Sequence, residues 1–238
     1  INLEKARVLP GVVAVFGPED GKKFPFLPVL FPHSSLIPVT QRPFDFVVHH
    51  VGEPVAMVIA QNRYIAEDGI ELIDVEYEPF PSVAHLHDAV KNDAPLAHQH
   101  LKTNVAAHFQ QSVGDAKAAM DEADVVVHHR FKIGRVSCLP IETRGMLAKW
   151  DFNGPEPFLE MHAATQGQHE MRSILANMLS ISENNVRVIA PDVGGAFGAK
   201  AIFYVEDFLV AWAAREVKAP VRWIEDRMEH MMSCIHER

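Results

Sequence analysis

The sequence has little cysteine, no excess of positive charge and no long apolar run. Its two cysteines, Cys138 and Cys234, lie far apart without paired spacing among 238 residues, which excludes a disulfide framework and a zinc or iron–sulfur site built on cysteine pairs. We therefore expect a reducing, cytoplasmic setting. The 22 Lys and Arg against 31 Asp and Glu give a formal net charge of −9, which argues against nucleic acid as a partner. No stretch reaches the roughly 18 apolar residues that would span a bilayer.

The remaining composition is that of an ordinary globular protein. Apolar residues make up 48% and charged residues 22% of the chain, and a chain of this length holds one or two domains. The sequence begins at Ile1 without a methionine, reads at once into strand-like residues, and ends at Arg238 without a stop signal. We expect both ends to be cuts through a longer protein, which could have carried a leader.

Residues 1–85 have the pattern of a small α/β unit. Residues 24–43 hold five prolines, which predicts an irregular loop because proline cannot donate to a sheet ladder. Around this loop, apolar runs, helical spacing and period-two alternation predict a strand, a strand, a helix and a strand, at 12–16, 55–60, 63–72 and 73–78.

A polar, turn-rich stretch over 86–103 predicts a linker, and residues 104–238 are interpreted as a second unit. Here the patterns predict strands at 124–133, 144–150, 158–163, 186–190 and 220–224, and helices ending at 120, over 167–179, over 201–218 and from 226. A strand, a glycine-rich loop, a helix and a strand in succession are typical of α/β architecture. The predicted fold class is therefore α+β or α/β.

The strongest local signal is the loop Gly194-Gly195-Ala196-Phe197-Gly198, between a predicted strand and a predicted helix. Small residues let backbone N–H groups approach a ligand with no Cβ in the way, which suits an anion or an oxo group. The following Ala199-Lys200-Ala201 does not match the Gly-Lys-Ser/Thr ending of a P-loop, and Gly-x-Gly-x-x-Gly is not matched either. A tight packing turn explains the spacing at least as well, so both interpretations stay open.

Other candidate residues carry weaker signals. Gln166 lies between a strand and a helix, where its carboxamide could donate to a bound acceptor, although most such glutamines are exposed or cap a helix. The 14 histidines never form the i, i+4 pair with a nearby glutamate that a helical zinc site needs, so we predict no metal ligands. Cys138 is interpreted as a buried structural thiol, and Glu142 with Arg144 as a candidate buried ion pair.

Six segments acquire meaning from their order along the chain. They are ARVLPGVVAV at 6–15, VGEPVA at 51–56, DVEYEP at 74–79, PIETRG at 140–145, TQ at 165–166 and GGAFGAK at 194–200. No single segment is specific, but the ordered set resembles the large, molybdopterin-binding subunit of the molybdenum hydroxylases. This family contains xanthine dehydrogenase, aldehyde oxidase and aerobic carbon monoxide dehydrogenase.

The resemblance implies an α/β hammerhead domain over 1–85 and the first part of a molybdopterin-binding domain over 104–238. It implies that Gln166 hydrogen-bonds an oxo ligand of molybdenum, and that the backbone of Gly195, Ala196, Phe197 and Gly198 lies against the metal end of the cofactor. The implied cofactor is a molybdenum-pterin in its molybdopterin cytosine dinucleotide form. [2Fe–2S] clusters and FAD are expected on other domains or subunits, in a dimer of heterotrimers.

The implied chemistry is hydroxylation of an aldehyde, an N-heterocycle or a similar small substrate with water as oxygen source, or oxidation of carbon monoxide. In this family a glutamate base belongs to a segment far downstream, so we expect no catalytic residue here and no activity from this chain alone. Purine-hydroxylating members carry a glutamate where this sequence has Ala201, which argues against xanthine. The loop with the copper-binding cysteine of carbon monoxide dehydrogenases would lie beyond Arg238.

Two alternatives to an incomplete hydroxylase subunit stay open. One is a naturally split, non-catalytic cofactor-binding or assembly subunit that needs a partner chain to complete the site. The other is a pseudo-enzyme that uses the scaffold only for interaction.

Overall fold

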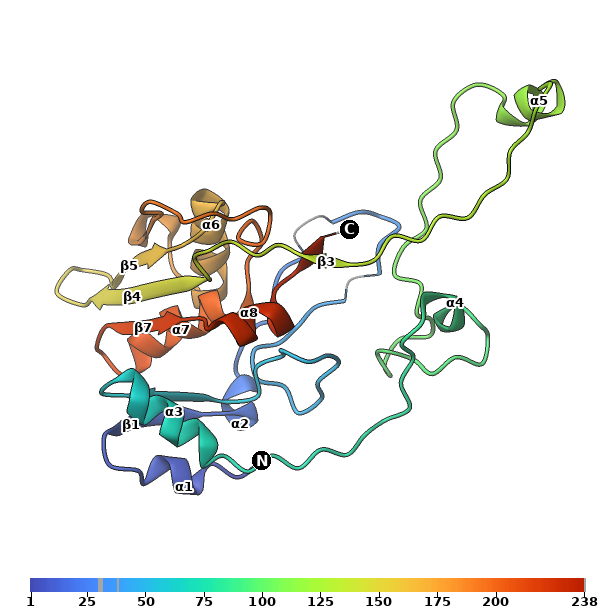
Figure 1. The fold of residues 1–238 in the computed structure, drawn as a ribbon. Coiled ribbons are helices and arrows are strands. Elements are labelled where there is room, and N and C mark those ends of the chain that lie inside the picture. Colours follow the sequence, from blue (N-terminus) through green and yellow to red (C-terminus); the bar gives the residue numbers. More distant parts are fainter. Residues whose placement is uncertain (30–31, 38, 238) are drawn as a thin grey trace. The chain divides into compact units, whose positions relative to one another are not determined.

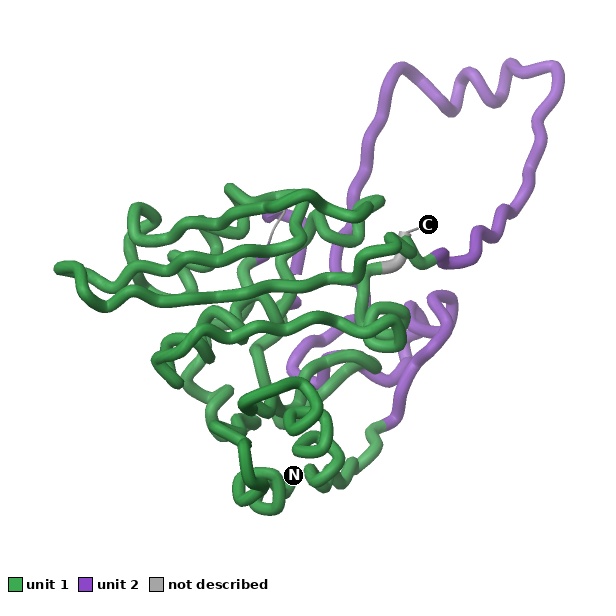
Figure 2. Tube along the Cα trace, turned by 60° about the vertical axis from the view of Figure 1, so that its left-hand side comes forward, with its two compact units in different colours: residues 1–28, 40–80, 137–237 green, residues 29–39, 81–136, 238 purple. Residues whose placement is uncertain are grey.

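The computed structural model describes residues 1–29, 32–37 and 39–237, and the chain divides into two compact units (Figures 1 and 2). Unit 1 comprises residues 1–28, 40–80 and 137–237, and unit 2 comprises residues 29–39 and 81–136. Helices and strands are mixed along the chain, which confirms the predicted fold class. The linker predicted at 86–103 and the domain bounds drawn around it stay predictions.

The N-terminal part of unit 1 contains a two-stranded antiparallel sheet with three helices. The elements are α1 (Glu4–Arg7), β1 (Val12–Phe16), α2 (Pro18–Gly21), β2 (Met57–Ala60) and α3 (Arg63–Glu71). Asn62 starts α3 where the sequence predicts, because its side chain accepts a hydrogen bond from the N–H of Ile65. The strand predicted at 73–78 is wrong: the segment is extended, but only Asp74 forms a bridge, to Asn2.

A four-stranded sheet forms the larger part of unit 1. Its order is β6 (Val186–Ile189), β5 (Phe158–Ala163), β4 (Gly145–Asp151) and β7 (Val221–Ile224). The β5–β6 pair is parallel and the other two pairs are antiparallel. The helices of this part are α6 (Gln168–Leu179), the 3₁₀ turn η1 (Glu183–Asn185), α7 (Val205–Glu216) and α8 (Arg227–Ser233). These elements confirm the strands predicted between 144 and 224 and the helices predicted over 167–179 and from 226, whereas the helix predicted over 201–218 is shorter and begins only at Val205.

Helix α7 lies in the core of unit 1 and is buried along most of its length. On the side of the four-stranded sheet, the indole of Trp150 in β4 donates a hydrogen bond to the carbonyl of Ala211 at 2.8 Å. On the other side, Trp212 contacts Phe16 and Phe24, each with ring centroids 4.6 Å apart in edge-to-face geometry. The loop that precedes α7 is therefore attached to a rigid element.

Unit 2 has little regular structure. It contains the helices α4 (Leu86–Ala89) and α5 (Ala116–Asp121). The two-residue strand β3 (Val136–Ser137) begins at the last residue of unit 2, and the two-residue strand β8 (His236–Glu237) belongs to unit 1. The side chain of Asn104 donates to the carbonyls of Ala89 and Pro95 at 3.0 and 2.9 Å. The strand predicted at 124–133 is wrong, because this extended segment pairs with no strand in the part of the chain described here.

Candidate functional site

The glycine-rich loop between β6 and α7 is built from left-handed backbone. Gly195, Phe197 and Gly198 have φ angles of +93°, +51° and +89°. Glycine adopts this conformation without strain, whereas Phe197 pays a conformational cost that its surroundings must offset. The Phe197 ring is mostly exposed, so its own burial does not supply that offset. The loop is thus held in shape from outside its tip.

The loop presents backbone donors that have no acceptor. Among the residues that the structure describes, none accepts a hydrogen bond from the N–H of Gly195, Ala196, Phe197 or Gly198. The neighbouring carbonyls are largely engaged, and the following five accept hydrogen bonds: Gly194 from Glu142 N–H, Ala196 from Ala199 N–H, Gly198 from Ala201 N–H, Ala199 from the Tyr204 hydroxyl, and Lys200 from Gln166 N–H. An excess of free donors over free acceptors favours an oxygen-rich or anionic ligand.

Glu142 holds both ends of this loop. Its Oε2 accepts a hydrogen bond from the N–H of Gly194 at 2.8 Å and an ion pair from Nζ of Lys200 at 2.7 Å, while its own N–H donates to the carbonyl of Gly194. Burial opposes ionisation of this carboxyl, but the hydrogen bonds from Lys200 and Gly194 outweigh it and hold the pKa of Glu142 below its ordinary value. The carboxylate is therefore the charge partner of a fully buried ammonium.

Gln166 follows β5 and lies at the C-terminal end of the same loop. Its backbone N–H donates to the carbonyl of Lys200 at 2.9 Å, and the hydroxyl of Thr165 reaches that carbonyl at 3.4 Å. The side chain of Gln166 is exposed, and no described residue forms a hydrogen bond with its carboxamide. One backbone hydrogen bond, to Lys200, therefore joins Gln166 to the end of the loop that contains Gly195, Ala196, Phe197 and Gly198. These four residues and Gln166 are the five candidate cofactor-binding residues of the sequence analysis.

The candidate ion pair between Glu142 and Arg144 is not formed, because each residue has a different partner. Arg144 is buried and binds Glu225 through Nε at 2.9 Å and Nη2 at 2.5 Å, and Glu206 through Nη2 at 3.2 Å. Its guanidinium also lies 3.9 Å from the ring centroid of Tyr204. The two carboxylates raise the pKa of Arg144 despite the opposing effect of burial. Glu206 and Glu225 lie 62 and 81 residues from Arg144 in the sequence, so no local pattern predicted them as its partners.

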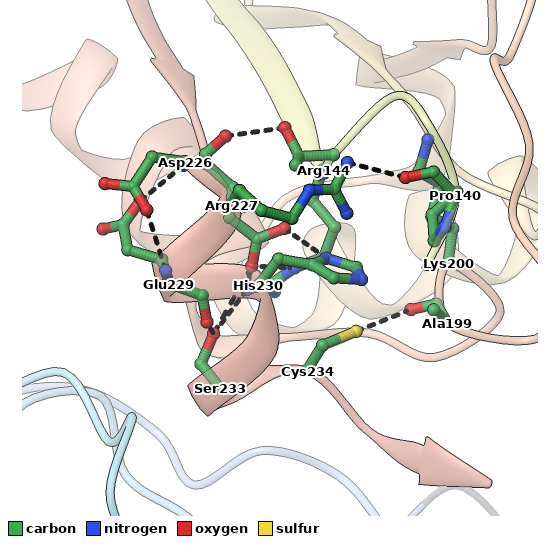
Figure 3. Close-up of polar contacts among 12 residues, drawn as sticks. Pro140, Arg144, Ala199, Lys200, Asp226, Arg227, Glu229, His230, Ser233 and Cys234 are labelled. Atoms are coloured by element: carbon green, nitrogen blue, oxygen red, sulfur yellow. Dashed lines mark hydrogen bonds and ion pairs between the residues drawn. The ribbon is translucent and has the colours of Figure 1, made fainter. Parts of the chain in front are cut away.

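The buried Arg144 cluster continues into α8 (Figure 3). Glu225 accepts a hydrogen bond at Oε2 from Nδ1 of His230 at 2.8 Å, and Nε2 of the same ring lies 2.9 Å from the carbonyl of Cys138. His230 is fully buried, so both ring nitrogens are fixed by these contacts. Cys138 itself is half-buried, whereas Cys234 is buried and contacts the carbonyl of Ala199 through Sγ at 3.7 Å. Burial raises the pKa of the Cys234 thiol.

No metal centre made of protein side chains is found in the described residues. They contain no group of three or more His, Cys, Asp or Glu that could hold an ion. In the same part of the chain, no helix is both long and apolar enough to cross a membrane. What the site offers is hydrogen-bond donors: four main-chain N–H groups and one carboxamide. This donor set fits a cofactor that carries acceptor oxygens of its own and brings its own metal.

Unpaired main-chain donors on a loop between a strand and a helix, with a free carboxamide on the residue bonded to the end of that loop, would suit a ligand rich in acceptor oxygens. The chain belongs to the molybdenum hydroxylase family of xanthine dehydrogenase, aldehyde oxidase and carbon monoxide dehydrogenase, which confirms the resemblance. Residues 97–238 match the molybdopterin cofactor-binding domain, and residues 1–81 match the aldehyde oxidase and xanthine dehydrogenase a/b hammerhead domain.

The relatives are large subunits of oxidoreductases. Over 190 residues, 80% of this chain, the sequence is 36% identical to the nicotine 6-hydroxylase large subunit of Paenarthrobacter nicotinovorans. Over its whole length it is 32% identical to the carbon monoxide dehydrogenase large chain of Afipia carboxidovorans. The crystal structure of quinoline 2-oxidoreductase from Pseudomonas putida 86 matches all of this chain with a TM-score of 0.84 and 32% identity. The chain spans 23% of the first of these proteins and 30% of the other two.

Proposed function

We propose that this chain forms one wall of a molybdenum-pterin site in an oxidoreductase. The observation that carries the proposal is the set of unpaired N–H groups of Gly195, Ala196, Phe197 and Gly198, with the free carboxamide of Gln166 at the end of the same loop. When bound, the cofactor supplies the redox chemistry. Gln166 donates from its side-chain nitrogen to an oxygen of the cofactor, and the loop donates from its main chain.

The chain's own contribution is to bind and orient the cofactor. Main-chain donors in a fixed loop need no reorganisation when charge develops on the group that they face, which is the property that makes such donors effective. Five of the carbonyls around the loop already accept hydrogen bonds, so few protein acceptors compete with the cofactor's oxygens for the loop donors.

The finer features are part of the same proposal. We propose the cytosine dinucleotide form of the cofactor, and separate iron–sulfur and FAD subunits in a dimer of heterotrimers. The substrate is an aldehyde, an N-heterocycle or a similar small molecule, or carbon monoxide. Ala201 has no carboxylate with which to hold a purine, so xanthine is disfavoured. The relatives named for nicotine hydroxylation and carbon monoxide oxidation support this range of substrates.

The test is Gln166→Ala in the intact protein. Turnover should fall by about 10²–10³-fold, because removing one donor to a developing charge costs that much in comparable sites. Molybdenum and pterin content should stay measurable, since the loop donors remain. Gln168→Ala is the matched control: Gln168 is the first residue of α6, and no described residue pairs with its side chain. Unchanged turnover in Gln166→Ala, or an unmodified protein without molybdenum and pterin, would contradict the proposal.

A further inference from the structure

We propose that Glu142 is a positioning residue that sets the shape of the cofactor-binding loop, an inference that rests on the function proposed above. The loop's own hydrogen bonds, from Ala199 N–H to the Ala196 carbonyl and from Ala201 N–H to the Gly198 carbonyl, lie in its second half. Three of its residues are left-handed, one of them the non-glycine Phe197, and four of its N–H groups are unpaired. A loop of this kind rearranges to pair its donors with its own carbonyls unless both of its ends are fixed.

Glu142 fixes both ends with a single carboxylate. Oε2 accepts from the N–H of Gly194 and from the ammonium of Lys200, which are six residues apart in the chain. The approach at the first end is so close that a Cβ on Gly194 would lie 2.7 Å from the Cβ of Glu142. Only glycine at 194 therefore allows this contact. The two contacts therefore fix the backbone on either side of residues 195–198, whose N–H groups are unpaired.

Glu142 is itself held by a rigid segment. Nη2 of Arg227, the first residue of α8, donates to the carbonyl of Pro140 at 2.7 Å (Figure 3). The same nitrogen donates to the carbonyl of Ile141 at 2.8 Å. The ring of Pro140 is fully buried, and its Cβ would lie 3.3 Å from a Cβ on Gly195. On the C-terminal side, Thr143 donates to the carbonyl of Glu225 at 2.6 Å. Contacts with α8 and with the residue after β7 therefore fix the backbone on both sides of Glu142, and Glu142 in turn fixes the loop.

Lys200 serves this anchor and does not serve the ligand. Its side chain is completely buried, and its ammonium donates to Glu142 at 2.7 Å. A lysine at the end of a glycine-rich loop often reaches a phosphate, but this one has its charge neutralised inside the protein. The two partners differ in exposure: 42% of the Glu142 side chain is exposed, whereas none of the Lys200 side chain is. Lys200 therefore depends on Glu142 for its counter-charge, while Glu142 also has access to water.

The experiment compares Glu142→Ala and Lys200→Met in the intact protein, with hydrogen exchange of the loop amides and cofactor content as readouts. Glu142→Ala should speed exchange at Gly194, Ala199 and Ala201 by at least about tenfold, the effect of losing a hydrogen bond to a charged group. Lys200→Met opens only one end, so exchange should rise at Ala199 and Ala201 and stay unchanged at Gly194. Both variants should lose molybdenum and pterin faster on dilution than the unmodified protein does.

Glu183→Gln is the matched control, because Glu183 forms an exposed ion pair of similar length with Arg172, 2.8 Å, outside the loop. If Glu142→Ala fails to fold, Lys200→Met with its position-dependent exchange decides the matter. Exchange and cofactor loss indistinguishable from the Glu183→Gln control would overturn the role of Glu142 while leaving the cofactor proposal intact. An unmodified protein without molybdenum or pterin would refute the proposed function, and exchange at Gly194, Ala199 and Ala201 would still decide whether Glu142 fixes the loop.

Discussion

Replacing Arg144 by methionine tests whether the buried charge cluster stabilises unit 1 by electrostatics or only by packing. The Arg144 side chain is 3% exposed and lies between Glu225, which is fully buried, and Glu206, which is 18% exposed. Methionine fills much of the same volume but leaves both carboxylates without their guanidinium. Breaking a buried ion pair in this way costs about 3–5 kcal/mol, because an uncompensated charge stays buried. We expect a loss in that range at pH 8.

The pH dependence separates the two explanations. In the unmodified protein, burial opposes ionisation of Glu225, but Arg144 outweighs it and holds the pKa below its ordinary value of 4.5. Stability from this group is therefore present above pH 4.5 and is lost only as the pH falls through the lower, folded value. In Arg144→Met, burial without the guanidinium raises the pKa of Glu225. The variant's stability should then rise as the pH falls toward 4.5.

The assay is urea unfolding of the intact protein at pH 8 and pH 5, followed by tryptophan fluorescence. Trp150, Trp212 and Trp223 all lie in unit 1, and the ring of Trp223 is 5.4 Å from the Arg144 guanidinium. The penalty of Arg144→Met should be at least about 1 kcal/mol smaller at pH 5 than at pH 8. Arg172→Met, which removes an exposed ion pair, should cost at most about 1 kcal/mol. An equal penalty at both pH values would refute the electrostatic account.

Two further changes have effects that can be worked out from single contacts. Burial raises the pKa of Asp207 to about 7 from 3.8, against a hydrogen bond from the N–H of Tyr204. The folded protein therefore binds a proton in this range that the unfolded chain does not, and stability falls with rising pH by up to about 1.4 kcal/mol per unit. Asp207→Asn should abolish that slope in urea unfolding between pH 5 and 7, and an unchanged slope would assign it to another group. A Cβ on Gly21 would lie 1.9 Å from the backbone oxygen of Phe44, so Gly21→Ala should cost about 1–3 kcal/mol or more in thermal unfolding. Gly134→Ala, where nothing lies within 4 Å, should stay within about 0.5 kcal/mol, and equal losses in the two alanine variants would contradict the steric account.

Local patterns predicted the elements of the four-stranded sheet well, because these elements are specified by their own residues. Alternation in β4 buries Met146, Ala148 and Trp150 on one face, and helical spacing in α6 buries Met171 and Leu175. The same reasoning failed where a strand needs a neighbour. Periodicity at 73–78 and 124–133 predicted strands that the structure does not contain, because a ladder also requires a partner strand, which no local pattern encodes.

The site was predictable only in its residue types. Glycines at 194, 195 and 198 indicate a loop that can approach a ligand, and the structure shows that its donors are unpaired. The partner of Glu142 could not be read from spacing. The sequence prediction paired Glu142 with Arg144, but Glu142 precedes β4 and turns toward Gly194 and Lys200, 52 and 58 residues away. Long-range pairing of charges is decided by tertiary packing.

The electrostatics of the loop follow from that pairing. Glu142 neutralises Lys200, so the attraction of the loop for a ligand comes from the N–H dipoles of 195–198 and from the Gln166 carboxamide, and not from a formal positive charge. Dipoles of this kind act over short distances and in fixed directions, whereas an ammonium attracts any anion at long range. The loop should therefore discriminate by the position of acceptor oxygens more than by total charge. Binding of inorganic phosphate to the unmodified protein should accordingly weaken little as the salt concentration rises, and a steep loss of binding with salt would place the charge of Lys200 in the site.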